Sequence, residues 1–120
     1  MPNFIGWNGY YQAIGYERNG VLAGGVVYTN ASPTNVMLST VLEAPLTRRF
    51  LYAIFHYPFV QLRVRRVTAL VEDWNERSIA LIKHVGFVEE GRMRQAARDG
   101  GDVILFGLLR GDCRFLARPR

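Results

Sequence analysis

Much of the first third of the chain consists of runs of apolar and β-branched residues that are separated by turn-forming residues, the pattern of β-strands. Two such runs, residues 12–18 and 21–29, are separated only by Asn19 and Gly20, the pair that most strongly favours a two-residue hairpin turn. A third run covers residues 35–43 after a loop of small and polar residues. The pattern predicts three strands before the first helix, while the first ten residues form either a short edge strand or an irregular arm.

A helical pattern follows, with apolar residues three and four positions apart at Leu51, Ile54 and Phe55. Thr47 is suited to cap this helix, because its hydroxyl can accept a free backbone N–H of the first turn. Pro58 lacks a backbone N–H and is expected to end or kink the helix, so that residues 59–62 form at most a last turn.

A second helix is predicted between Asn75, a favourable N-cap residue, and Gly86, which suits the left-handed position that closes many helices. On a helical wheel one arc is apolar and the other is polar. The apolar arc holds Ile79, Leu81, Ile82 and Val85 together with Ser78, whereas Glu76, Arg77, Ala80, Lys83 and His84 lie opposite. A hydroxyl on the apolar arc either bonds back to the backbone of its own helix or lines a ligand groove.

Strand patterns surround the second helix. Residues 67–72 precede it, and residues 88–97 and 102–109 follow it as a hairpin with a glycine-rich turn, with Gly91 suited to a bulge. The helical crossover from residues 35–43 to residues 67–72 makes that pair of strands parallel. The predicted fold is a single α/β (α+β) domain, with a mixed, mostly antiparallel sheet around one parallel pair and two main helices.

The composition is that of one globular domain, since the 120 residues are 49% hydrophobic and 21% charged. No apolar stretch approaches the length of a membrane span and no signal-peptide pattern opens the chain, so a cytoplasmic protein without membrane association is expected. Cys113 is the single cysteine and has no histidine close to it in sequence, which favours a packing role. No residue spacing indicates a metal site.

The net charge of +5 comes almost entirely from arginine, and Lys83 is the only lysine. Arginines cluster within residues 63–66 and towards the C-terminus, where they could serve a phosphorylated cofactor, an acidic protein or nucleic acid. A genome that encodes arginine in place of lysine explains the same excess. No zinc spacing, aromatic sheet motif or basic zipper accompanies the charge, so nucleic acid is not the expected partner.

The most specific pattern of the chain lies within residues 66–94. Its landmarks, in order, are Asn75, Ser78, Lys83, Gly86, Phe87, Glu90, Gly91 and Arg94. This order resembles the C-terminal half of the GNAT acyltransferase superfamily, and most closely the branch that acetylates ribosomal proteins and protein N-termini. Short phage-encoded members of the superfamily look similar as well. The likeness extends over residues 13–115.

The resemblance implies that acetyl-CoA binds in a cleft between two splayed parallel strands. The first helix would hold the phosphates at its positive end, the preceding strand would flank the pantetheine arm, and the second helix would form the other wall. The cofactor-binding residues so implied are Leu42, Thr47, Arg48, Arg49, Asn75 and Ser78.

The chain departs from the superfamily pattern in three places. Residues 46–51 lack the glycines of the usual phosphate loop, so Arg48 and Arg49 either supply side-chain donors or lie at a solvated helix start. The tyrosine that serves many members as the acid is replaced by Ile82, which leaves this role to Ser78, to water or to nothing. Too few residues precede the first predicted hairpin to wall the acceptor site, as expected of a minimal fold, a chain completed by a partner subunit or an inactive member.

Acyl transfer to an amine requires that the amine is neutral and held against a polarised carbonyl. Glu43, at the end of the strand nearest the implied cofactor, is the first candidate for the base, and Glu72 and Asp73 are the next. The alternative for Glu43 is a surface carboxylate. A backbone N–H near Leu42 could polarise the thioester. The two histidines have no partners at catalytic spacing.

The sequence therefore predicts an acetyltransferase that acylates a primary amine of a protein N-terminus, a side chain or a small molecule. The alternative is a catalytically inactive GNAT-like module whose arginine surface binds a protein or nucleic acid. A third possibility is a homodimer through the last strand, because the apolar run in residues 103–115 would otherwise need to be covered.

Overall fold

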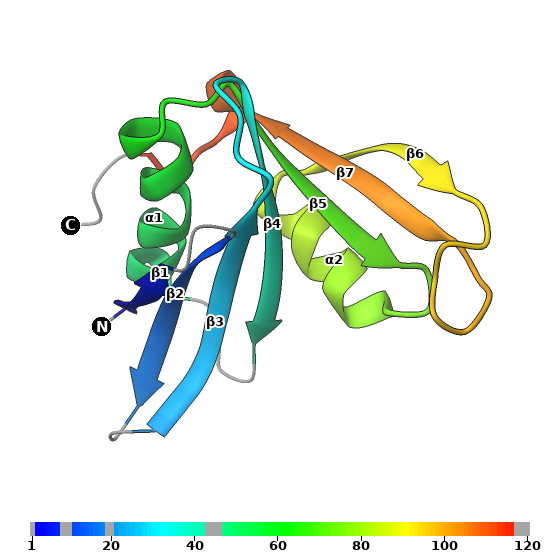
Figure 1. Ribbon diagram of the computed structural model, residues 1–120, viewed down its shortest axis with the longest axis horizontal. Helices are drawn as coiled ribbons and strands as arrows, with labels where there is room; N and C mark the ends of the chain where they lie inside the picture. The colour runs from blue at the N-terminus through cyan, green and yellow to red at the C-terminus, as the bar shows by residue number, and fades with distance from the viewer. Residues whose placement is uncertain (1, 8–10, 19–20, 43–46, 117–120) are drawn as a thin grey trace.

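The computed structural model describes residues 2–7, 11–18, 21–42 and 47–116 (Figure 1). The strands within these ranges are β1 (Pro2–Trp7), β2 (Tyr11–Arg18), β3 (Val21–Thr29), β4 (Asn35–Leu42), β5 (Arg66–Glu72), β6 (Val88–Met93) and β7 (Val103–Leu109). The helices are α1 (Arg48–His56) and α2 (Glu76–Val85), with a π-helical turn at Tyr57–Gln61 and a 3-10 turn at Arg110–Asp112.

All of these strands form one sheet in the order β1-β2-β3-β4-β5-β7-β6, in which β4 and β5 are parallel and the other pairs are antiparallel. The predicted mixed sheet with one parallel pair is thus confirmed. β1 settles the alternative left open at the start of the chain, because it forms an edge strand against β2. The prediction of three strands before the first helix was one strand short.

The last hairpin differs in length from its prediction. β6 ends at Met93, because the chain turns at Gln95, which has a left-handed backbone with φ of 60°. The predicted bulge is present, since the register of β6 against β7 shifts between Glu89 and Gly91. β7 is not an edge strand, because it lies between β5 and β6. Its apolar run is covered within the chain, so the reason for expecting a dimer through this strand no longer applies.

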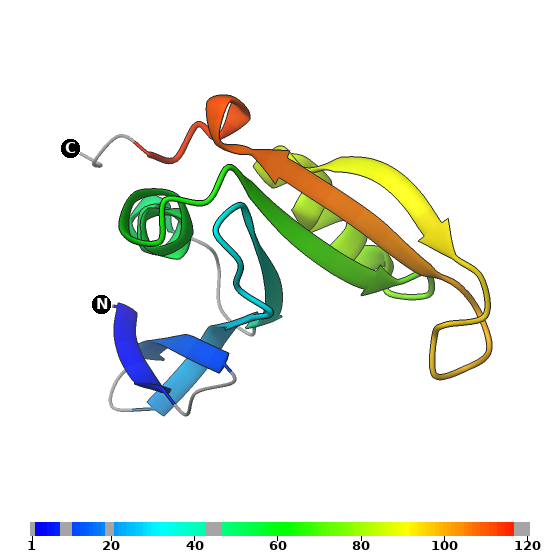
Figure 2. The same ribbon diagram turned by 45° about the horizontal axis from the view of Figure 1, so that its top comes forward.

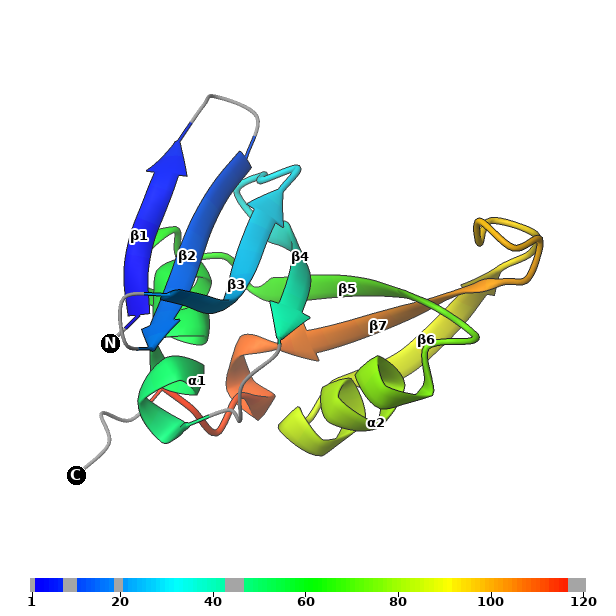
Figure 3. The ribbon, with the colours of Figure 1, turned by 90° about the horizontal axis from the view of Figure 1, so that it is seen from below.

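Both helices pack on the same face of the sheet (Figures 2 and 3). In β5, the buried residues Val67, Ala69 and Val71 alternate with residues that point to the other face. The core on the helix side contains Val26, Tyr28, Val36, Leu38, Ile104, Phe106 and Leu108 from the other strands, with Phe50, Ile54 and Phe55 from α1 and Ile82 and Val85 from α2. The opposite face carries no helix in the described part of the chain. We call it the helix-free face.

The predicted division of α2 into two arcs is confirmed, because Ile82 and Val85 are buried whereas Lys83 and His84 are exposed. Cys113 packs half-buried against the same core, as its predicted packing role requires. Burial raises the pKa of the Cys113 thiol.

The α-helix ends at His56, just before Pro58, as predicted, and the chain continues for one π-helical turn, Tyr57–Gln61, that contains the proline. The proline nitrogen carries no hydrogen, so the Ile54 carbonyl lacks the donor that a regular helix places four residues later. The buried Tyr28 hydroxyl donates to this carbonyl at 2.6 Å. Burial raises the pKa of Tyr28 well above its ordinary value, which keeps the hydroxyl protonated. β3 therefore supplies the hydrogen bond that the proline removes from α1.

A row of polar side chains crosses the helix-free face where β4 and β5 are paired. The Thr68 hydroxyl donates to Asn35 Oδ1 at 2.7 Å and accepts from Arg66 Nε at 2.8 Å. Arg66 also forms an ion pair with Glu90 at 2.6 Å. These side chains lie over Gly107 of β7, where an added Cβ would come within 2.6 Å of the guanidinium. The row thereby joins β4, β5 and β6 across β7.

We expect Tyr28→Phe to lower the free energy of unfolding by about 1 to 3 kcal/mol, because it leaves the buried Ile54 carbonyl without a donor. Urea unfolding followed by circular dichroism measures the change. Tyr52→Phe is the matched control, because Tyr52 is half-buried on α1 and its hydroxyl makes no hydrogen bond in the described part of the chain. It should change the stability by less than about 0.5 kcal/mol. Equal losses in the two variants would contradict the role assigned to Tyr28.

Candidate functional site

The parallel strands β4 and β5 are paired over only part of their length. Residues 35–38 lie opposite residues 66–69, and beyond this point no bridge joins the two strands. β4 remains paired with β3 as far as Leu42, and β5 remains paired with β7 as far as Glu72. Within the described residues, the inner edges of both strands therefore present backbone N–H and C=O groups that no strand partner satisfies.

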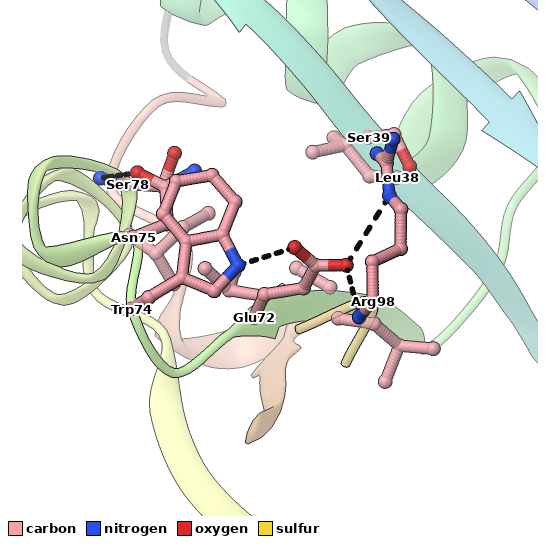
Figure 4. Close-up of a pocket in the computed structure, with 11 residues that line it drawn as sticks. Leu38, Ser39, Glu72, Trp74, Asn75, Ser78 and Arg98 are labelled. Carbon is pink, nitrogen blue, oxygen red and sulfur yellow. Dashed lines mark hydrogen bonds and ion pairs between the residues drawn. The ribbon is translucent and has the colours of Figure 1, made fainter. Parts of the chain in front are cut away.

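A pocket of about 290 Å³ occupies the gap between the separated strands, and we call it the slot (Figure 4). Its walls come from β4, β5, the turn before α2, α2 itself and the loop between β6 and β7. Ala69, Val71 and Ile82 line it on the helix side, and Leu70 and Glu72 line it on the helix-free side. The slot thus reaches both faces of the sheet.

The N-terminus of α2 forms one wall of the slot. Asn75 caps the helix as predicted, because its Oδ1 accepts the Ser78 N–H at 3.2 Å. Ser78 lines the slot, and its hydroxyl makes no hydrogen bond within the described residues. Of the two alternatives for this hydroxyl, the structure has the groove-lining one, so a polar group is available to a ligand there.

A carboxylate is fixed at the helix-free side of the slot (Figure 4). Glu72 Oε1 accepts the Arg98 backbone N–H at 3.2 Å, and Glu72 Oε2 accepts the Trp74 indole N–H. The Arg98 Nε lies 3.5 Å from the same Oε1. The Arg98 backbone N–H, followed by the Trp74 indole and the Arg98 charge, lowers the pKa of Glu72. Glu72 is therefore ionised at neutral pH.

Asp73 holds the loop between β6 and β7 in place beside the slot. Its Oδ2 accepts the Asp102 N–H at 3.0 Å, and its own N–H donates to the Asp102 carbonyl at 2.9 Å. Gly101 packs against this carboxylate so closely that an added Cβ would lie 2.6 Å from Oδ1. Asp73 thus supports the loop that carries Arg98, and it does not line the slot.

The predicted phosphate-binding residues lie at the start of α1. Thr47 caps α1 as expected, because its Oγ1 accepts the Phe50 N–H at 3.1 Å. Arg48 and Arg49 are exposed in the first turn, and in the described part of the chain neither makes a contact that would occupy its guanidinium. None of these three residues lines the slot. α1 begins shortly after β4 ends, so its positive end lies near the C-terminal end of β4 (Figure 3).

The other predicted site residues have mixed outcomes. Leu42 is the last residue of β4, and its backbone is paired with Gly24. Glu43, the first candidate for the base, lies outside the described residues. Ile82 is buried in the slot wall, so it presents an alkyl side chain there.

Sequence reasoning missed Trp74 and Arg98 as residues of the site. Trp74 follows a strand and precedes a cap, a position that resembles an ordinary turn. Arg98 lies 26 residues beyond Glu72, so no local spacing connects the two residues. The only sign of Arg98 in the sequence was that a charged residue stands beside a glycine-rich turn. That position does not indicate which carboxylate the loop contacts in the folded chain.

Two of the clustered arginines have structural partners. Arg66 is bound to Thr68 and Glu90, as described above. The Arg114 guanidinium donates to the His84 carbonyl and lies 5.1 Å from the centre of the Phe115 ring. These two arginines are therefore committed to contacts within the chain.

The described residues contain no group of three or more histidine, cysteine or carboxylate side chains that could hold a metal ion. None of the helices in that part of the chain has the length and apolar character needed to cross a bilayer.

Comparison with known proteins identifies the class of fold. No protein-family model matches the sequence, and no curated protein matches it significantly. Solved structures do match. Campylobacter jejuni N-acetyltransferase PseH in complex with acetyl coenzyme A aligns with a TM-score of 0.68 and 14% identity, over 86% of this chain and 70% of that one. A mutant of spermidine N-acetyltransferase SpeG from Vibrio cholerae aligns with a TM-score of 0.75 and 21% identity, over 91% and 70%.

Two further structures, both assigned as acetyltransferases and one of them from T. thermophilus, align with TM-scores of 0.75 and 0.74 and 23% identity. They match 88% of this chain, whereas the chain spans 60% and 62% of their length. The chain therefore has the GNAT acetyltransferase fold, as the resemblance implied, and it is shorter than those proteins.

The lowered pKa of Glu72 predicts a pH-dependent contribution to stability. A carboxyl group whose pKa is lower in the folded state stabilises that state above its ordinary pKa of 4.5, and this contribution disappears as the pH falls through the folded value. Glu72→Gln should therefore be less stable than the parent protein at pH 7, and the difference should shrink below about pH 4. Urea unfolding at both pH values measures it.

Glu89→Gln is the control for this measurement. Glu89 is exposed on β6, and its nearest charged partner, Arg92, is 3.9 Å away. This variant should show no comparable change with pH. A Glu72→Gln deficit that stays constant between about pH 7 and about pH 3.5 would contradict the assigned pKa shift.

Proposed function

We propose that this chain is an acetyl-CoA-dependent N-acetyltransferase domain, with the slot as the site of acyl transfer. The observation that carries the proposal is the separation of β4 and β5, which leaves backbone groups without a strand partner on both sides of the slot in the described part of the chain. PseH, which shares this fold, was solved with acetyl coenzyme A bound. In this proposal residues 1–120 act as a single domain.

The free strand edges suit the amide groups of a pantetheine arm, because an extended chain with N–H and C=O groups can pair with them as a strand would. Leu42 would flank this arm on β4, and Asn75 and Ser78 would flank it on α2. The phosphates would bind at the start of α1, where Thr47 is the cap and the helix dipole favours negative charge. Arg48 and Arg49 would add side-chain donors in place of the missing glycines.

The chemistry requires that an amine nitrogen bonds to the acetyl carbon while the bond from that carbon to sulfur breaks. Ser78 is the candidate to donate a hydrogen bond or a proton to the departing sulfur, because its hydroxyl lines the slot and the side chain of Ile82 has no donor. Glu43 remains the candidate for the base that takes the proton of the amine. Glu72 is a poor base, because its pKa is lowered. Its fixed negative charge is better suited to binding.

The acceptor in this proposal is a primary amine. This class includes a protein N-terminus, as in the ribosomal-protein branch, an amine of a protein side chain and a small amine. SpeG, which shares the fold, is a spermidine N-acetyltransferase. The alternative function, an inactive GNAT-like binding module, is favoured by Ile82 at the position of the superfamily acid. A measurement of CoA thiol release in the presence of amines distinguishes the two functions, because only an active acetyltransferase releases the thiol.

Acetyl-CoA should raise the midpoint of thermal unfolding, because a ligand that binds only the folded state stabilises it. At a hundredfold excess over its dissociation constant the gain is about 2.7 kcal/mol, which corresponds to several degrees for a small domain. Desulfo-CoA should act in the same way, and ATP should act less. An unchanged midpoint at millimolar acetyl-CoA would overturn the proposed function.

Ser78→Leu should abolish this stabilisation by acetyl-CoA, because the larger side chain fills the slot. The fold should persist, since the Ser78 hydroxyl makes no hydrogen bond within the described residues. Ala80→Leu is the matched control, because Ala80 is exposed on the other side of the same helix. It should keep the full response. If both variants respond to acetyl-CoA alike, the ligand does not bind in the slot.

A further inference from the structure

Glu72 and Trp74 form the entrance to the slot on the helix-free face. Strand alternation directs Val71 towards α2 and Glu72 to the opposite face. Trp74 is 56% exposed, whereas Ile82 on the helix side of the slot is buried. A molecule that approaches the slot from the helix-free face therefore meets the carboxylate and the indole first.

The arrangement of these two side chains is that of a binding site for a cation. The Glu72 side chain is 20% exposed, and its carboxylate is oriented by a backbone N–H and an indole N–H, neither of which neutralises its charge. An ionised carboxylate has about four acceptor positions, so it retains capacity for a further donor. The bond from the indole N–H to Glu72 fixes the ring of Trp74 beside the charge. The face of such a ring attracts ammonium and guanidinium groups.

The guanidinium of Arg98 lies at this site, and it is bound there only weakly. Its Nε lies 3.5 Å from Glu72 Oε1, and its side chain is 95% exposed. An ion pair of such an exposed, flexible side chain contributes little stability. The stronger contact comes from the Arg98 backbone N–H, which does not depend on the side chain. A competing cation can therefore displace the guanidinium while the loop stays attached to Glu72.

We propose that Glu72 and Trp74 bind a positively charged group of the acceptor, distinct from the amine that is acetylated, and that the Arg98 side chain occupies this site when no acceptor is present. The inference rests on the proposed function, and it narrows the acceptor to amines that carry a second positive charge. Diamines and amines next to a basic side chain belong to this class.

The experiment compares 1,4-diaminobutane with n-butylamine, which have the same chain length and differ in the second amine. The protein should prefer the diamine in kcat/KM. Glu72→Gln should reduce kcat/KM for the diamine by about tenfold, mainly through KM, because the amide lacks the negative charge that strengthens the hydrogen bond from the second ammonium group. The value for butylamine should change little. Trp74→Leu should act in the same direction.

Arg98→Ala provides a test with the opposite sign. This variant removes the competing guanidinium and keeps the backbone N–H that holds Glu72, so KM for the diamine should fall. Glu89→Gln, on exposed β6 and outside the slot, is the matched charge control and should leave both acceptors unchanged. A rise in KM for the diamine in Arg98→Ala would show that Arg98 itself binds the acceptor, and it would overturn the inference.

The inference and the proposed function fail in distinguishable ways. If acetyl-CoA does not stabilise the parent protein, the proposed function fails. If acetyl-CoA stabilises all the variants but Glu72→Gln affects diamine and monoamine equally, the inference alone fails. Calorimetric titration of each amine into protein saturated with desulfo-CoA gives the same comparison without turnover. Equal affinity of the parent protein for the two amines would also overturn the inference.

Discussion

The short pairing between β4 and β5 is the constraint on which the rest of the structure depends. Four residue pairs join the two strands, and each strand then continues with its outer neighbour. The separation of β4 from β5 therefore costs hydrogen bonds only on the edges that face each other. The ladders to β3 and β7 keep both strands extended. The polar row of Asn35, Thr68, Arg66 and Glu90 lies where the strands are still paired. It joins the strands of the C-terminal half to β4 at the closed end of the slot.

The two helices stabilise different halves of the separated sheet from the same side. α1 is tied to β3 by the hydrogen bond from Tyr28 to Ile54, and α2 packs on β5 and β7. The halves share one core, in which the ring of Phe55 lies 6.1 Å from that of Phe87. Because both helices occupy one face, the slot stays open to the other face in the described part of the chain. The packing that holds the halves together thus also separates a covered side from an accessible side.

Carboxylates organise the open end of the slot. Glu72 and Asp73 each accept a backbone N–H from the loop between β6 and β7, at Arg98 and Asp102. The loop is therefore positioned by β5 as well as by its own strands. This explains why β6 ends earlier than its sequence pattern suggests: the residues after Met93 bond to the end of β5 and to Asp102 instead of extending the ladder. The same contacts place Arg98 beside the slot.

The sequence by itself determined the features that depend on neighbouring residues. Thr47 and Asn75 cap their helices because each side chain reaches an N–H three residues ahead, and the arcs of α2 follow from its own periodicity. Likewise, the crossover from β4 through α1 to β5 required a parallel pair.

The tertiary structure decided the features that depend on distant residues. β1 forms only by pairing with β2, Pro58 is tolerated because Tyr28 supplies a donor from another strand, and Glu72 meets Arg98 because a hairpin folds back on β5. Local patterns carry no information about such partners, since contacts between distant segments are set by the path of the whole chain.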